Sequence, residues 1–338
     1  MARTTPAAIP LVSPYLENPY SVIDLFSGLG GFSLGAQRAG FTHVAGLEVD
    51  PLAVHYYRMN VGPCWEGDVI HQGHPPFRSP FVFADLPSFW SRGGGRRVVP
   101  MNQSDRGLAT DEIIHTFRIA REAGAEVVGL SWPRAGNSLS PNWSMRSPGN
   151  TVLWVEKAAR EAGYRAILTA PILFADYGVS HLRKRFLSFC FPTQRLADKF
   201  NFPAPTHGFP GSPWIGLDQV LPYIPYPDPC PSITGQENLA VWPDGKVRKK
   251  IWASTHIVSI IGREAWNRPY PGLSTREIAR IHGAPDSWML PSAWFEVARN
   301  YELAGAIFSP IVANVVCTSV MEYIRLRYKE VVKKASKS

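Results

Sequence analysis

Hydrophobic residues occur along this chain in short runs that alternate with stretches of helical period. From Tyr20 onwards, runs rich in Val, Ile, Leu and Phe are followed by segments whose apolar positions recur every three or four residues. The runs predict strands at 21–26, 44–49, 81–84, 127–131 and 185–191. The periodic segments predict helices at 32–39, 50–60, 111–123 and 151–162. This alternation is typical of an α/β fold with a doubly wound, mostly parallel sheet.

Other signals indicate where elements and larger units begin and end. Asp50 and Pro51 occupy the favoured Ncap and N1 positions of a helix. After residue 191 the periodicity is lost, and residues 192–232 hold ten prolines. Helical periods return at 274–282 and 310–328. We therefore expect an extended leader at 1–19, a main domain at 20–191, a reduced loop-rich lobe at 192–272, a C-terminal helical return at 273–328 and a basic tail at 329–338.

Composition narrows the class of protein. The 338 residues are 45% hydrophobic and 18% charged, which supplies a large core and argues against global disorder. Lys and Arg outnumber Asp and Glu by 35 to 27, and the net charge of +8 suits a polyanionic partner. The four cysteines form no Cys-x-x-Cys pair, so we expect no metal site, no disulfide framework and an intracellular location, in the cytoplasm or nucleus. No run approaches the roughly 18 apolar residues of a membrane span.

A glycine-rich turn joins the first predicted strand to the first helix. Residues 24–32 read Asp-Leu-Phe-Ser-Gly-Leu-Gly-Gly-Phe, and such glycines let backbone amides approach a ligand at a helix N-terminus. The next strand ends with Glu48, at the spacing where such folds place a carboxylate on ribose hydroxyls. A further acid, Asp68, follows the second helix. A glycine-tolerant tight turn with capping acids is the alternative interpretation.

These motifs together resemble the S-adenosylmethionine site of the cytosine-5 DNA methyltransferase family. The resemblance continues in family order at residues 176–185, 231–235, 273–286 and 301–313. It implies the Rossmann-like fold of S-adenosyl-L-methionine-dependent methyltransferases, with a small loop-rich second lobe and 20–191 as the cofactor-binding domain. It also implies the cofactor contacts: Phe26, Ser27, Gly28, Gly30 and Gly31 around the methionine part, Glu48 on the ribose hydroxyls, and Asp68 on the adenine amine.

The expected reaction centre departs from the family pattern. In the family, a cysteine thiolate adds to C6 of a flipped cytosine while a glutamate binds the ring. Ser88 stands where that cysteine is expected, and a serine hydroxyl is far less acidic than a thiol. The strand that should end with the glutamate reads Val-Val-Gly-Leu-Ser-Trp-Pro, with Leu130 in place of the acid. Cys230 is a remote candidate for a replacement nucleophile, but each cysteine is expected to be a small buried hydrophobe.

Basic residues of the family pattern remain. The resemblance implies that Arg183 and Arg185 support a flipped base. Arg92, Arg96 and Arg97 lie in a glycine-rich stretch that resembles the family's mobile substrate loop, although a solvated loop explains them too. Lys249 and Lys250 lie between two tryptophans, a pattern that suits nucleic acid or equally a hairpin edge guarded by lysines. The short region between residues 186 and 272 puts sequence-specific readout of a duplex in doubt.

Three functional hypotheses follow. In the first, the chain is a pseudoenzyme that keeps the S-adenosylmethionine site, lacks cytosine C5 methylation, and serves as a nucleic-acid-binding or regulatory partner. Its partners would be DNA or, as a second candidate, RNA, together with an active methyltransferase or another protein subunit. In the second, it methylates an exocyclic amine, because residues 85–89 resemble the Asp-Pro-Pro-aromatic loop of amino-methyltransferases. In the third, C5 methylation uses an unrecognised nucleophile, or serine has been introduced in place of a native cysteine.

Overall fold

The structure is a computed structural model that describes residues 14–71, 74–86, 105–133, 149–224, 226–230, 237–241, 247–251, 274–290 and 307–337. Its centre is a seven-stranded sheet in the order β3-β2-β1-β4-β5-β7-β6. The strands are β1 (Ser21–Leu25), β2 (His43–Glu48), β3 (Cys64–Glu66), β4 (Phe81–Asp85), β5 (Val127–Pro133), β6 (Ala166–Leu173) and β7 (Lys184–Phe191). Strands β1 to β5 pair in parallel, and β7 runs antiparallel to both β5 and β6. The predicted doubly wound, mostly parallel sheet is confirmed.

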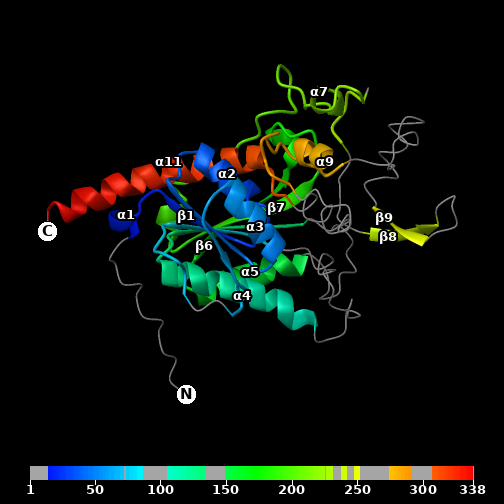
Figure 1. Cartoon of the computed structure of the whole chain (residues 1–338). Helices are drawn as coiled ribbons and strands as arrows, with labels where there is room; N and C mark the ends of the chain where they lie inside the picture. The colour runs from blue at the N-terminus through cyan, green and yellow to red at the C-terminus, as the bar shows by residue number, and fades with distance from the viewer. Residues whose placement is uncertain are drawn as a thin grey trace.

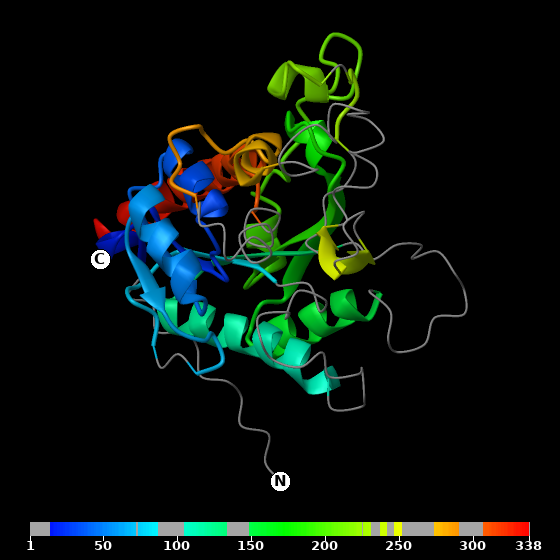
Figure 2. The same ribbon diagram turned by 45° about the vertical axis from the view of Figure 1, so that its right-hand side comes forward.

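Helices cover both faces of the sheet. The helices are α1 (Pro14–Glu17), α2 (Gly31–Arg38), α3 (Pro51–Asn60), α4 (Asp105–Ala123), α5 (Gly149–Glu161), α6 (Gln194–Ala197), α7 (Leu217–Val220), α9 (Thr275–Ile281) and α11 (Pro310–Ala335), with a 3-10 turn, η1, at Phe174–Tyr177. Helices α4 and α5 lie on one face, and α2, α3 and α11 lie on the other (Figures 1 and 2). The central strands are therefore buried on both sides, which explains their nearly continuous apolar sequence.

Two clusters of buried side chains fill the space on either side of the sheet. On the α2 and α11 side, the ring of Phe32 stacks on that of Phe83 with centroids 3.6 Å apart, and Phe308 packs edge-on against both. On the α4 and α5 side, Phe117 packs against Tyr164. Successive residues of β4 contribute to opposite clusters, as the alternating direction of strand side chains requires. Because both faces are closed by helices, a ligand can reach the sheet only at its ends.

Several elements differ from the predicted pattern. Strands β3 and β6 were not predicted: β3 is very short, and β6 contains Pro171, which argues against a central strand. Because β6 is the last strand of the sheet, the proline is tolerated there. Helix α1 lies inside the expected leader. Helix α11 continues to Ala335 instead of ending at Tyr328, since lysines favour helix and complement its C-terminal dipole.

The region after β7 is rich in loops, as its prolines suggest. Its described part contains α6 and α7 and a separate antiparallel hairpin of β8 (Glu237–Val241) and β9 (Val247–Ile251). Lys249 and Lys250 lie on β9, so the hairpin expected as one alternative is present. Among the helices that the structure describes, none is both long and apolar enough to cross a bilayer.

Candidate functional site

The turn after β1 has a backbone that most residues cannot adopt. Phe26, Gly28 and Gly30 have φ angles of 56°, 52° and 89°, in the left-handed region that favours glycine. At Gly31, an added Cβ would lie 2.0 Å from the carbonyl oxygen of Phe308, so only glycine fits there. At Gly28, by contrast, an added Cβ would meet no described residue within 4 Å. The turn is therefore packed tightly behind Gly31 and open in front of Gly28.

Glu48 is held in place at the end of β2 by backbone amides. Its Oε2 accepts a hydrogen bond from the Gly28 N–H at 2.8 Å, and its Oε1 accepts from Val49 and Asp50 at 2.8 and 2.9 Å. Burial raises the pKa of Glu48, while these hydrogen bonds lower it. A carboxylate has about four acceptor positions, so three bonds leave capacity for a ligand hydroxyl. Glu48 therefore contacts the glycine turn directly, and its expected contact with ribose hydroxyls stays a prediction.

Asp68 lies near Glu48 because it follows β3, the strand that pairs with β2. The Gly67 N–H donates to the Glu48 carbonyl at 2.9 Å, and Asp68 Oδ1 accepts from the Ile70 N–H at 2.9 Å. Val49, which the family motifs did not single out, is 60% exposed between Glu48 and Asp50. An exposed aliphatic group between two acids offers a contact surface for a flat ring. The sequence signal for this role is the position of Val49 directly after Glu48.

Asp24 belongs to a buried network behind the turn. Its Oδ2 accepts from the Ser33 hydroxyl at 2.6 Å, and the Ser33 oxygen accepts from the Tyr57 hydroxyl at 2.7 Å. Burial raises the pKa of Asp24 to about 8, although the Ser33 hydrogen bond opposes the shift. The carboxyl is therefore mostly neutral at pH 7 and joins β1, α2 and α3 without an internal charge.

A second group of polar residues lies where β4, β5 and β7 meet the same edge of the sheet. Arg185 Nη2 lies 3.2 Å from Asp85 Oδ2, and the two side chains are only 5% and 12% exposed. Arg183 Nη1 donates to the Ile307 carbonyl at 2.9 Å, and its guanidinium lies over the Phe174 ring. Within the protein, Arg183 contacts the segment entering α11 and Arg185 pairs with a carboxylate. That the two arginines support a flipped base stays a prediction.

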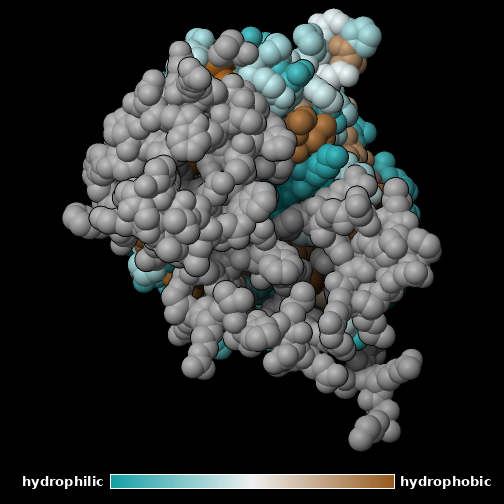
Figure 3. Space-filling model, turned by 90° about the vertical axis from the view of Figure 1, so that its right-hand side faces the viewer, coloured by the Kyte–Doolittle hydropathy of each residue, from teal (hydrophilic) through white to brown (hydrophobic). Residues whose placement is uncertain are grey.

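Some predicted site residues cannot be placed. Ser88, Arg92, Arg96 and Arg97 lie outside the described residues, as do the side chains of Lys249 and Lys250. Figure 3 looks onto the side of the molecule that lies at the right of Figure 1, where the described surface includes a hydrophilic strip beside a hydrophobic patch.

All four cysteines of the chain are described, and all are buried free thiols. Burial raises the pKa of Cys64 and of Cys230 to about 12, and it raises the pKa of Cys190 and Cys317 as well. Strand β5, which carries no acidic residue, places Ser131 directly beside Asp85 in the parallel ladder. At this end of the sheet the carboxylate therefore comes from Asp85 of β4.

Comparison with known proteins agrees with this arrangement. Residues 20–75 match the family described as C-5 cytosine-specific DNA methylase. The chain is 26% identical over 340 residues to Type II methyltransferase M.NgoMIV of Neisseria gonorrhoeae, covering 90% of this chain and 98% of that protein. It is 30% identical over 186 residues to Type II methyltransferase M.HhaI of Haemophilus parahaemolyticus, covering 54% and 52%. The crystal structure of S. pombe Dnmt2 methyltransferase matches with a TM-score of 0.58 at 15% identity, over 89% of this chain and 98% of that one.

The sheet has the Rossmann-like architecture, and the family match together with the similarity to Type II methyltransferases implies an S-adenosylmethionine-dependent methyltransferase. Within that class, residues 20–75 match the C-5 cytosine-specific DNA methylase family and the chain is similar over most of its length to a Type II methyltransferase, and the cytosine-5 homologues use S-adenosyl-L-methionine as methyl donor. The residues present fit this cofactor. The open space at Gly28, the remaining acceptor capacity of Glu48 and the exposed Val49 would accommodate its chain, its ribose and one face of its adenine.

Proposed function

We propose that this chain binds S-adenosylmethionine and nucleic acid but does not methylate cytosine at C5, and that it serves as a nucleic-acid-binding or regulatory partner. The observation that carries the proposal is the state of its thiols. Transfer to C5 requires a thiolate that can add to C6, and every cysteine here is a buried, neutral thiol.

A cysteine that replaces the missing nucleophile must also be exposed close to the target base. Cys230 lies close to Arg183 in the structure, because its backbone N–H donates to the Ser180 carbonyl and its carbonyl accepts from the Leu182 N–H. Its side chain is nevertheless fully buried and its pKa is about 12. Cys64 lies 3.7 Å from the Ser27 hydroxyl, at the cofactor turn and away from the β4–β7 group. Neither thiol supplies an exposed thiolate at pH 7.

Serine is a poor substitute at position 88. Its hydroxyl would need a strong neighbouring base, and a carboxylate such as Asp85 is a weak base toward an alcohol. The missing acid on β5 removes the second requirement of the C5 reaction. Nucleic-acid binding is supported by the +8 net charge and by the family, whose members act on DNA. DNA is therefore the proposed ligand, with RNA and a protein partner as further candidates.

Cofactor binding is testable by calorimetry. The native protein should release or absorb heat on titration with S-adenosylmethionine, and Glu48→Ala should abolish binding, because the ribose hydroxyls lose their acceptor. Glu66→Ala is the matched control. It removes an exposed acid from β3, at the position paired with Glu48, and the variant should bind S-adenosylmethionine normally. Absence of heat with native protein would contradict the cofactor part of the proposal.

Activity is tested by incubating the protein with labelled S-adenosylmethionine and mixed DNA or RNA, followed by digestion to nucleosides. We expect no 5-methylcytosine, and we expect Ser88→Cys to remain inactive because β5 lacks the acid. Detection of 5-methylcytosine with native protein would overturn the proposal. A methylated exocyclic amine, on cytosine or adenine, would instead establish amine methylation. Methylation by Ser88→Cys would show that only the thiol was missing.

A further inference from the structure

Three side chains near the reaction end of the sheet hold polar atoms that lack partners. Asp85 Oδ1, Ser131 Oγ and both Nε and Nη1 of Arg185 are buried, and within the described structure none has a hydrogen-bond partner. More than nine in ten buried polar groups are normally paired. Four unpaired atoms on three neighbouring side chains therefore require an explanation specific to this place.

Strand register brings these atoms together on one face of the sheet. Asp85 pairs with Ser131 in the parallel β4–β5 ladder, and Ser131 pairs with Leu187 in the antiparallel β5–β7 ladder. Arg185 lies two residues before Leu187, and side chains two apart on a strand point the same way. All three polar side chains therefore project on the face that also bears Phe83, the face covered by α2 and α11.

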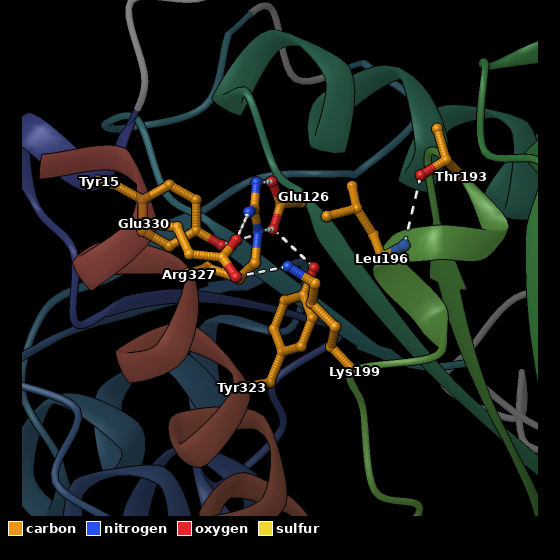
Figure 4. A network of polar contacts seen from close by, with 8 residues as sticks. All are labelled: Tyr15, Glu126, Thr193, Leu196, Lys199, Tyr323, Arg327 and Glu330. Carbon is orange, nitrogen blue, oxygen red and sulfur yellow. Dashed lines mark hydrogen bonds and ion pairs between the residues drawn. The ribbon is translucent and has the colours of Figure 1, made fainter. Parts of the chain in front are cut away.

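A purely structural ion pair in the same molecule looks different. Glu126 Oε1 accepts from Tyr15, Tyr323 and Arg327, and its Oε2 accepts from Arg327 again (Figure 4). Both oxygens of Glu126 are thus used within the protein. In the Asp85–Arg185 pair, a single contact of 3.2 Å joins Oδ2 to Nη2, and the remaining groups are unused. The contrast indicates that Asp85 and Arg185 are arranged for a ligand.

The unused groups define the chemistry of that ligand. Asp85 Oδ1 can only accept a hydrogen bond, whereas Arg185 Nε and Nη1 can only donate. A planar ring that carries an exocyclic amine next to a ring nitrogen or carbonyl complements this set. Cytosine and adenine have such an edge, whereas uracil and thymine place a carbonyl where the amine would be.

We propose that Asp85 and Arg185 form one recognition edge for an extrahelical nucleobase with an exocyclic amine, and that Asp85 is the specificity-determining acceptor. Asp85 thereby stands in, from β4, for the carboxylate that β5 lacks. Arg185 donates to the ring or carbonyl acceptors, and Ser131 adds a hydroxyl at the same face. This inference rests on the nucleic-acid binding proposed above, and it requires no methyl transfer.

The test measures base discrimination by fluorescence anisotropy. Four labelled duplexes share one sequence and differ at one position opposite an abasic site, which holds cytosine, adenine, uracil or no base. Native protein should bind at least one of the two amine-bearing duplexes about tenfold or more tightly than the uracil duplex, since one well-placed pair of hydrogen bonds gives that discrimination. The cytosine and adenine arms decide which ring fits.

Asp85→Asn should reduce this discrimination to less than about threefold, because an amide offers both a donor and an acceptor and can serve either base. Binding to the uracil duplex should tighten, because the amide can donate to the uracil carbonyl that the carboxylate repels. Glu126→Gln makes the same chemical change in the saturated ion pair, so it is the matched control: it should lower the melting temperature and leave discrimination unchanged.

Thermal unfolding without ligand shows whether Asp85→Asn is folded. If it is not, Asp85→Glu retains a charge for Arg185 but displaces the acceptor by one methylene, and it should also lose discrimination. Native protein that binds all four duplexes equally, or a folded Asp85 variant that discriminates as native does, would overturn this inference and leave the proposed nucleic-acid binding intact. Native protein with no affinity for any duplex would overturn both.

Discussion

At the level of single residues, burial decides the protonation state of a side chain and therefore its role. Asp24 stands in the glycine-turn motif, where its sequence position marks it as one more acid. In the structure it is buried against Ser33 and Tyr57, and its pKa rises from 3.8 to about 8. A neutral carboxyl can form these hydrogen bonds without the desolvation that a buried charge would require. Asp24 is therefore a structural hydrogen-bonding group at neutral pH.

Stability should consequently depend on pH through Asp24. Between pH 4 and pH 8 the folded protein holds a proton that the unfolded chain has lost, so this group makes stability fall as pH rises, by at most about 1.4 kcal/mol per pH unit. Asp24→Asn has no such proton and should remove that slope. We expect the variant to melt higher than native at pH 8 and to converge with it near pH 4. Parallel melting profiles would contradict this; exposed Asp228→Asn is the control.

At the element scale, the contact between α2 and α11 shows how packing overrides helix propensity. A Cβ added at Gly35 would lie 2.3 Å from the Ala313 Cβ and 2.6 Å from the Asn314 nitrogen. The two helices therefore approach each other at this glycine. Their contact also places Phe308, at the start of α11, behind the cofactor turn at Gly31.

Gly35→Ala should destabilise the protein even though alanine favours a helix by about 1 kcal/mol over glycine. The steric conflict with α11 should exceed that gain, for a net loss of about 2 kcal/mol in the free energy of unfolding. Chemical denaturation measures the difference. Arg38→Ala, on the exposed side of α2, is the control and should change stability by less than about 0.5 kcal/mol. A Gly35 variant more stable than native would show that the helices separate without cost.

Most strands of the central sheet can be predicted from the sequence. Strands β1, β2, β4, β5 and β7 follow from their apolar runs, and the helix after β2 follows from Asp50, whose side chain accepts from the Leu52 N–H. Strand β6 could not be predicted because its exposed and buried positions alternate irregularly. Its place is set by an eight-residue antiparallel ladder with β7, the next strand along the chain.

At the scale of the whole molecule, the edge of the sheet opposite the site is tied together by one carboxylate. Glu126, just before β5, receives Tyr15 from α1 and both Tyr323 and Arg327 from α11, and Arg327 also pairs with Glu330 (Figure 4). This network links segments near both ends of the described chain to the centre of the sheet. It joins α1 and α11 to the amino end of β5.

By itself, the sequence determined the family, the alternating α/β fold, the glycine turn with Glu48 and Asp68, and the absence of a thiol at position 88 and of an acid on β5. These features depend on the types of residue and on their spacing over short stretches of sequence, so they can be interpreted without the tertiary structure. Only the tertiary structure decided that every cysteine is buried, that Asp24 is mostly neutral, and that Asp85 faces Arg185. Desolvation and contact depend on distances between residues far apart in the chain, which no local pattern encodes.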